Sequence, residues 1–161
     1  MSWKIVALAV AVLVSVSVAV GAVGQSAGAQ KGRAQSTNGE TLRFAVKFSP
    51  LFLLDLGRHG LSKGDQIVEN DRLLNASGMR VGHDGLACTI TDASVPEAAC
   101  QGTFVLRGGQ ITVQFLNSPP SVKIGAITGG TGRFRTARGQ MRLVEPATGD
   151  VGRVTFALSD S

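Results

Sequence analysis

Hydrophobic and polar residues alternate along most of the chain after residue 40, in short runs that end at glycine or proline. In residues 110–116, for example, Ile111, Val113 and Phe115 share one face, and polar residues occupy the other. Alternation with a period of two predicts a β-strand with one buried face. The pattern predicts strands at 41–48, 66–74, 79–91, 100–107, 110–116 and 151–159, with one further strand on each side of the glycine-rich segment 128–132.

Short turns separate the predicted strands. Asn75–Gly78 and Gly108–Gly109 are typical of hairpin turns, because glycine and asparagine tolerate left-handed backbone conformations. The apolar segment 51–57 breaks the alternation and is interpreted as a plug or a short helical turn over a barrel end. Many short strands without a convincing long helix predict an all-β fold, an eight-stranded antiparallel β-barrel over residues 41–161, because closure removes exposed strand edges. Periodicity alone leaves a sandwich open, but the glycine-marked bends favour a barrel.

Residues 1–29 have the organisation of a secretory signal peptide. Lys4 precedes the uncharged apolar run Ile5–Val23, and Ala27–Ala29 matches the small-x-small cleavage pattern. An uncleaved membrane anchor is the alternative, because the run is about long enough to span a bilayer. Residues 30–40 are polar and predict a flexible linker. We therefore expect a secreted protein that touches a membrane only if this N-terminal segment is retained.

Charge and composition predict no nucleic-acid partner. The net charge of +5 is spread along the chain without a basic block. Tyrosine is absent, and the one tryptophan, Trp3, lies in the signal, so no platform for stacking bases is apparent. His59 and His83 are isolated. Asp65, Asp71 and Asp84 could supply ligands, but their default interpretation is as surface carboxylates, so we expect no metal. No nucleotide-binding or catalytic motif occurs, and we expect no cofactor.

The chain has two cysteines, Cys88 and Cys100, on consecutive predicted strands. A hairpin places them opposite one another, and an exported protein meets an oxidising compartment. We therefore expect a disulfide that stabilises the fold by about 3 kcal/mol through restriction of the unfolded chain. A reactive Cys88 thiol is the alternative interpretation.

Four polar residues are candidate ligand-binding residues: Glu69, Asp71, Arg72 and Gln114. Glu69 and Asp71 are two positions apart and share one face of a strand, whereas Arg72 points to the opposite face. Such a pair is either solvated outside the barrel or part of a polar lumen where burial raises one pKa for acid–base work. Bulky side chains are scarce, so we expect a cavity that opens at one barrel end, with residues 51–54 near its mouth. Asp71 or Glu69, Arg72 and Gln114 are the polar groups that we expect to face it.

The glycine-rich segment predicts a tight bend between two strands. Gly129, Gly130 and Gly132 are its turn residues, and at least one is expected to have a positive φ. The alternating run Arg133–Arg135 that follows predicts the beginning of the next strand.

Several short motifs occur together from about Lys63 to the C-terminus. They are Lys63–Asp65, Gly85–Cys88, Gly109–Gln114, Ala126–Gly132 and Gly139–Leu143. In order and spacing, these segments resemble the allene oxide cyclase-like and dirigent barrels, which have a GGTG-type turn between two strands. The resemblance implies a barrel that binds a small lipophilic molecule, and a homotrimer, because relatives are commonly trimeric.

The activity of the plant relatives does not carry over directly. Their cyclases use a glutamate on the first strand, whereas the predicted strand 41–48 has no carboxylate and Glu40 lies just before it. Dirigent pockets use Asp, Arg and Tyr, and this chain has no tyrosine. The expected function is lumenal binding of a small lipophilic molecule, with directed cyclisation or isomerisation as the candidate reaction. A non-catalytic ligand-binding barrel and a structural barrel with a filled core stay open as alternatives.

Overall fold

The computed structural model describes residues 39–159. The predicted signal peptide and residues 30–38 of the predicted linker lie outside this range. The described elements are β1 (Thr41–Lys47), β2 (Phe52–Leu54), β3 (Gln66–Glu69), β4 (Arg72–Leu74), β5 (Arg80–Asp92), β6 (Glu97–Leu106), β7 (Gly109–Asn117), β8 (Val122–Gly130), the 3-10 helix η1 (Gly132–Phe134), β9 (Gly139–Val144) and β10 (Val151–Leu158).

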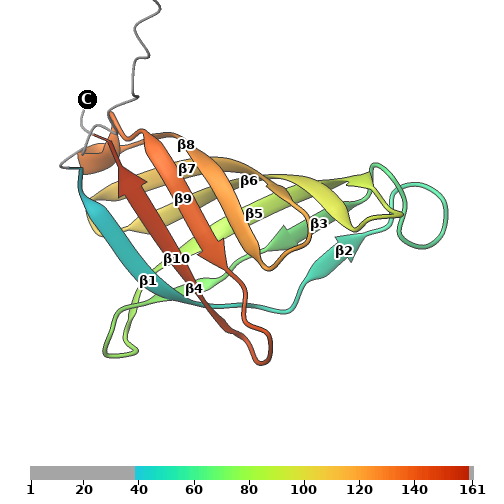
Figure 1. The fold of residues 1–161 in the computed structure, drawn as a ribbon, viewed down its shortest axis with the longest axis horizontal. Helices are drawn as coiled ribbons and strands as arrows, with labels where there is room; N and C mark the ends of the chain where they lie inside the picture. Colours follow the sequence, from blue (N-terminus) through green and yellow to red (C-terminus); the bar gives the residue numbers. More distant parts are fainter. Residues whose placement is uncertain (1–38, 160–161) are drawn as a thin grey trace, which may run out of the picture. The chain divides into compact units, whose positions relative to one another are not determined.

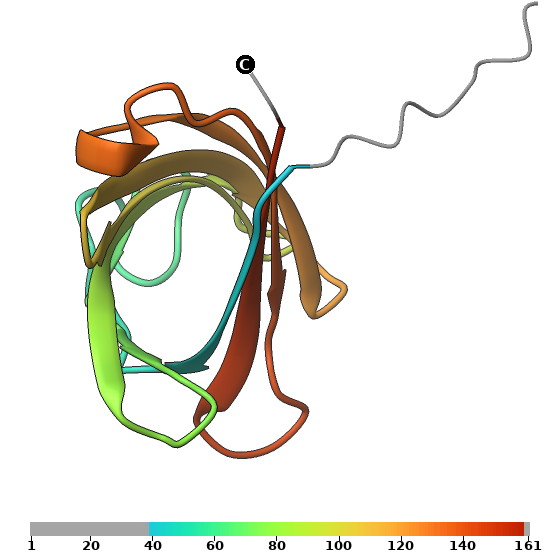
Figure 2. The same ribbon diagram turned by 90° about the vertical axis from the view of Figure 1, so that its left-hand side faces the viewer.

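These strands form the closed, eight-stranded antiparallel barrel that the sequence predicts (Figure 1). β1 and β2 act as one strand with a break at residues 48–51, and β3 and β4 act as a second strand with a break at 70–71. β5 pairs with both β3 and β4 on one side and with β6 on the other. From β6 the ring of paired strands continues through β7, β8, β9 and β10 back to β1. Figure 2 shows this ring from one end of the barrel.

Two local predictions were wrong. The apolar segment 51–57 contains no helical turn, because Phe52–Leu54 pairs with β3 as the strand β2, with Phe52 opposite Val68. The run Arg133–Arg135 begins no strand, because Gly132–Phe134 forms the 3-10 helix η1 and turns Phe134 inward. In both places the run of apolar residues was too short or too irregular to distinguish a strand from a turn. Across residues 39–159, no helix is long and apolar enough to cross a membrane.

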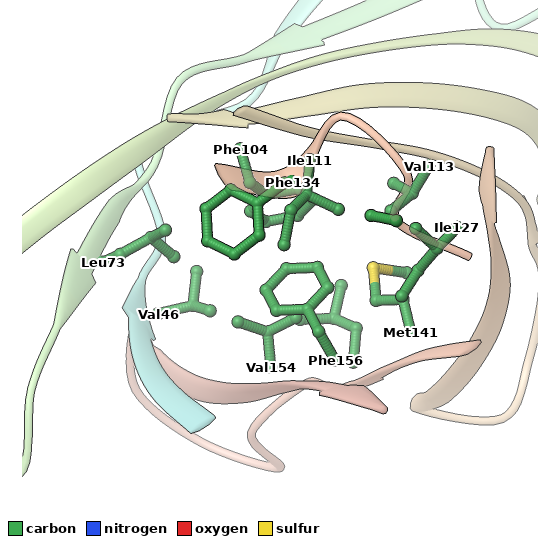
Figure 3. Close-up of a cluster of buried hydrophobic side chains, with 12 residues drawn as sticks. Val46, Leu73, Phe104, Ile111, Val113, Ile127, Phe134, Met141, Val154 and Phe156 are labelled. Atoms are coloured by element: carbon green, nitrogen blue, oxygen red, sulfur yellow. The ribbon is translucent and has the colours of Figure 1, made fainter. Parts of the chain in front are cut away.

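One end of the barrel interior, the end that η1 covers, is filled by apolar side chains (Figure 3). Phe104 and Phe156 are fully buried there, and their ring centroids lie 4.9 Å apart in an edge-to-face arrangement. Such a pair contributes about 0.5–1.5 kcal/mol beyond the burial of its area. The packed partners include Val46, Leu73, Ile111, Val113, Ile127, Phe134, Met141 and Val154. This cluster supplies the hydrophobic core and leaves the other end of the lumen free for a site.

The glycine turn before η1 confirms the expectation of a positive φ. Gly132 has a φ of 59°, and a Cβ built on it would lie 2.2 Å from the carbonyl oxygen of Gly108. Gly129 and Gly130 belong to β8 and do not share this conformation. The amide of Arg133 donates to the same Gly108 carbonyl at 2.8 Å, which ties the turn to the β6–β7 hairpin. Only glycine therefore suits position 132.

Candidate functional site

A cavity of about 540 Å³ lies in the lumen at the end that the apolar core does not fill. Its wall includes the buried or half-buried apolar residues Ile67, Leu86, Phe115 and Leu143. Leu51 also lines the cavity, within the segment expected near its mouth. The size and mixed lining are typical of a site for a small, largely apolar ligand.

The breaks in the paired strands bring carboxyl groups into this interior. Asp71 is fully buried at the break between β3 and β4, and its Oδ1 accepts a 2.7 Å hydrogen bond from the amide of Ser49 at the opposite break. The Asp71 amide donates to Asp84 Oδ1 at 2.8 Å, and the Asp84 amide donates to the Asp71 carbonyl at 3.1 Å. Asn70 Nδ2 donates to the Asp84 carbonyl. Side chains thus replace the missing ladder bonds, which explains why two carboxylates are built into the wall.

Glu69 lines the cavity two positions before Asp71. Burial, together with the negative charges of Asp71, Asp84 and Glu145, raises the pKa of its carboxyl to about 7. A carboxyl with this pKa is present in both its protonated and ionised forms near neutral pH. Such a group can both accept and donate a proton, which is the requirement for general acid–base chemistry.

The pKa values of the two neighbouring aspartates, Asp84 and Asp71, are raised as well. Burial raises the pKa of Asp84, backbone hydrogen bonds oppose the rise, the charge of Asp71 adds to it, and the net result is a pKa of about 6. Burial also raises the pKa of Asp71, although the hydrogen bonds from Ser49 oppose it. Asp71 Oδ2 is buried and has no hydrogen-bond partner among residues 39–159. Three carboxyls therefore disfavour full ionisation together.

A buried lysine completes the polar part of the lumen. Lys123 Nζ donates to the carbonyl oxygens of Ser118 and Pro120 at 2.7 and 2.9 Å. The same nitrogen lies 3.3 Å from Glu145 Oε2, and Glu145 lines the cavity. Lys123 therefore both fixes the β7–β8 loop and offsets the charge of Glu145.

The structure places the four predicted ligand-binding residues on two different faces. Glu69 faces the cavity and Asp71 the buried interior, whereas Arg72 and Gln114 are exposed. Gln114 lies between the inward residues Val113 and Phe115, so strand alternation turns it outward. The expectation that Arg72 and Gln114 face the lumen is therefore corrected.

Sequence reasoning missed three of the interior charged residues: Asp84, Lys123 and Glu145. The interpretation of Asp65 and Asp84 as surface carboxylates is wrong, because both are buried. Asp84 could have been found, because it is in phase with the inward residues Leu86 and Cys88 of the predicted strand 79–91. Lys123 has no such signal, because a lysine in a strand normally indicates a position that faces solvent. Glu145 lies just past the end of β9, where no periodicity applies.

Cys88 and Cys100 are opposite one another in the β5–β6 register, and their sulfur atoms are at bonding distance, 1.98 Å. This confirms the predicted pairing and leaves Cys88 without a free thiol. Such a pair is typical of an oxidising, extracellular environment. Cys88 also lines the cavity, so the disulfide forms part of its wall. Within the described part of the chain, no group of three His, Cys, Asp or Glu residues is placed to hold a metal ion.

Comparison with solved structures places this architecture among known proteins. A structure described as pyocyanin demethylase is 30% identical to this chain, with a TM-score of 0.65, and the match covers 74% of this chain and 100% of that one. This chain belongs to the allene oxide cyclase-like and dirigent-like barrel family. No protein-family model matches it, and no curated protein sequence matches it. The relationship is therefore detected by comparison of structures, and neither family models nor curated sequences reveal it.

Two more distant structures share the dirigent-like fold. A pterocarpan synthase dirigent protein is 18% identical, with a TM-score of 0.58, and the match covers 74% of this chain and 82% of that one. A Diels-Alderase from Streptomyces koyangensis is 14% identical, with a TM-score of 0.60, and the match covers 80% of this chain and 72% of that one. At these identities the likeness shows the fold alone.

Proposed function

We propose that this dirigent-like barrel binds a small, largely apolar molecule in the open end of its lumen and moves a proton on it during a cyclisation or isomerisation. One observation carries the proposal. Glu69 lines a cavity with apolar walls, and burial and neighbouring charges raise its pKa to about 7. General acid–base catalysis by a group with such a pKa contributes a factor of about 10²–10⁴ to a rate.

In this proposal Glu69 is the catalytic residue. Its ionised carboxylate accepts a proton from an acidic C–H, N–H or O–H of the ligand, and the carboxylic acid returns a proton at a second position of the same ligand. The reaction is balanced without an external oxidant or reductant. The apolar walls formed by Ile67, Leu86 and Phe115 hold the reacting ends of the ligand together, so that ring closure gains from proximity.

The comparisons suggest one reaction type and one candidate ligand. The fold is shared with a pterocarpan synthase dirigent protein and a Diels-Alderase, which favours a reaction that forms or rearranges a ring. The 30% identity to pyocyanin demethylase favours pyocyanin, or a molecule like it, as a second candidate ligand. A barrel that binds its ligand without reaction stays the alternative, and retention of an unchanged ligand distinguishes it.

Two further features belong to the proposal. The predicted signal peptide and the disulfide support export, with maturation after Ala29.

The neighbouring strands β5–β8 contain a continuous stretch without a charged residue, over 85–89, 99–105, 110–116 and 124–128. This surface supports a homotrimer. Light scattering of the purified protein should give three times the monomer mass, and Gln101→Lys, which puts a charge into this surface, should reduce it; a monomeric parent contradicts the trimer.

The test of the proposed function is a ligand screen followed by a matched pair of variants. The protein is incubated with lipophilic metabolites and pyocyanin, and native mass spectrometry identifies what it retains or converts. Glu69→Gln should retain ligand but lower turnover about 100-fold, because proton transfer is lost. Glu97→Gln makes the same chemical change at the start of β6, outside the cavity lining, and should behave as the parent. Failure of the parent to retain any ligand, or unchanged turnover in Glu69→Gln, would falsify the proposal.

A further inference from the structure

Basic side chains gather on one outer face of the barrel. Strands β4, β1, β10 and β9 are consecutive neighbours in the ring, and their residues include five cations and no carboxylate. These positions are far apart in the sequence, so no basic block is visible there, and closure of the barrel brings them together. We call this surface the basic face, and its exposed cations are Arg43, Lys47, Arg72, Arg142 and Arg153.

Two of these cations oppose one another. Lys47 lies directly opposite Arg72 in the β1–β4 register, and both side chains are exposed. Like charges in directly opposite positions destabilise a sheet. Asp150 lies 3.2 Å from Lys47 and offsets part of this charge. Among residues 39–159, no carboxylate lies within 4.0 Å of the guanidinium groups of the four arginines, so the face has a cationic excess that an external anion can neutralise.

The other three arginines form a triangle on the basic face. Arg43 and Arg142 flank Thr155 in one cross-strand row, and Arg153 lies two positions from Thr155 on the same strand. With about 4.8 Å between strands and about 3.4 Å per residue, the Cα atoms of the three arginines lie within roughly 10 Å of one another. Arginine forms paired hydrogen bonds with phosphate oxygens. At this spacing, several phosphates of one chain can be bound at once.

We propose that the basic face binds a flexible, linear phosphate polymer. This binding is independent of the function proposed for the lumen, because Arg43, Arg72, Arg142 and Arg153 do not line the cavity. The uncharged stretch of β5–β8, which supports the proposed trimer, occupies the other half of the ring. Assembly through that surface therefore leaves the basic face open.

The shape and composition of the basic face favour a flexible chain over a membrane or a nucleic acid. The face is convex because it belongs to a closed barrel (Figure 2), so a flexible chain can follow it across four strands, whereas a flat bilayer meets a narrower strip. Val151 is the one exposed large hydrophobic residue of these four strands, which leaves little to insert into a bilayer. Their two phenylalanines, Phe44 and Phe156, pack into the core and offer no platform for bases.

Fluorescence anisotropy of labelled long-chain polyphosphate, titrated at a series of salt concentrations, tests the proposal. Each phosphate contact adds roughly 0.7 to the slope of the logarithm of affinity against the logarithm of salt concentration. Arg142→Gln/Arg153→Gln should therefore weaken binding at least about tenfold at low salt and reduce this slope by about 1.4. Arg58→Gln/Arg107→Gln removes the same charge from exposed positions outside the basic face and should bind as the parent does.

The possible results separate this face from net charge and from other partners. Melting temperatures check that both double variants fold. Equal weakening in the two double variants would overturn the proposal, because net charge would then explain binding. Tighter binding of a DNA duplex or of phosphatidylglycerol vesicles, at equal concentration of anionic groups, would also overturn it, in favour of a nucleic acid or a membrane. Absence of polyphosphate binding by the parent at low salt would refute it and leave the lumenal function untouched.

Discussion

Replacing Glu69 by glutamine should stabilise the barrel at neutral and alkaline pH. The folded state raises the pKa of Glu69 from 4.5 to about 7, so the folded protein holds this proton more tightly than the unfolded chain does. Below about pH 4 both states are protonated and the group has no effect on stability. As pH rises toward 7 the unfolded chain ionises more readily, and the free energy of unfolding falls. Above this window the loss is complete and constant.

The magnitude follows from the same two values. A pKa that moves from 4.5 to about 7 corresponds to roughly 3 kcal/mol for a fully shielded group. Glu69 is only partly buried and lines an open cavity, so solvent screening reduces this figure to about 1–2 kcal/mol. Glu69→Gln keeps the shape of the side chain and removes the ionisation. We therefore expect the variant to gain about 1–2 kcal/mol over the parent at about pH 8 and nothing at about pH 4.

Guanidinium denaturation at a series of pH values measures this directly. The parent should lose stability between about pH 4 and pH 7, and Glu69→Gln should show a smaller loss, with Asp84 responsible for the remainder because its pKa is raised to about 6. Glu97→Gln serves as the control and should follow the parent. If Glu69→Gln is less stable than the parent at about pH 8, or if the two curves run parallel, Glu69 does not carry the raised pKa and the reasoning is refuted.

Three other predictions concern the fold and its maturation. Reduction of the Cys88–Cys100 bond should lower the free energy of unfolding by about 3 kcal/mol, and thiol titration of the unfolded, non-reduced protein should find no free thiol. Gly132→Val should cost about 1–3 kcal/mol in chemical denaturation, because φ is positive and Gly108 is close, whereas Gly129→Val should cost clearly less; equal losses would contradict this. N-terminal sequencing of exported protein should begin at Gln30, and a start at Met1 would favour an anchor.

The fold could be predicted from the sequence because most strands and turns are determined by residues that are close together in the chain. Alternation predicted the inward face of residues 110–116, where Ile111 and Val113 are buried, and the glycine pair Gly108–Gly109 located a hairpin that the structure contains. The errors have a physical origin. β2 is three residues long and is held by pairing with β3, and η1 is held by the Gly108 carbonyl. Such partners are distant in the chain, so no window of sequence reveals them.

Less of the candidate site could be predicted. Glu69 and Asp71 were found because they share one phase of a strand, and that phase faces inward. Gln114 was assigned to the lumen against the phase of its own strand, and the structure places it outside. Lys123 breaks the rule that inward positions are apolar, because two carbonyl oxygens and Glu145 satisfy its charge. A residue whose position depends on such long-range compensation cannot be placed from periodicity.

The interior carboxyls differ in their hydrogen bonds, and this difference separates their roles. Asp71 and Asp84 are bound to backbone amides at the broken strands, so their side chains hold the barrel wall together and have little freedom to move. The Glu69 carboxyl accepts no hydrogen bond from residues 39–159, although it feels the charges of both aspartates. A group that is fixed by the fold is poorly suited to exchange protons with a ligand, and a group that is free and electrostatically tuned is well suited to it. In the proposed function, Asp71 and Asp84 are therefore positioning residues, and proton transfer begins at Glu69.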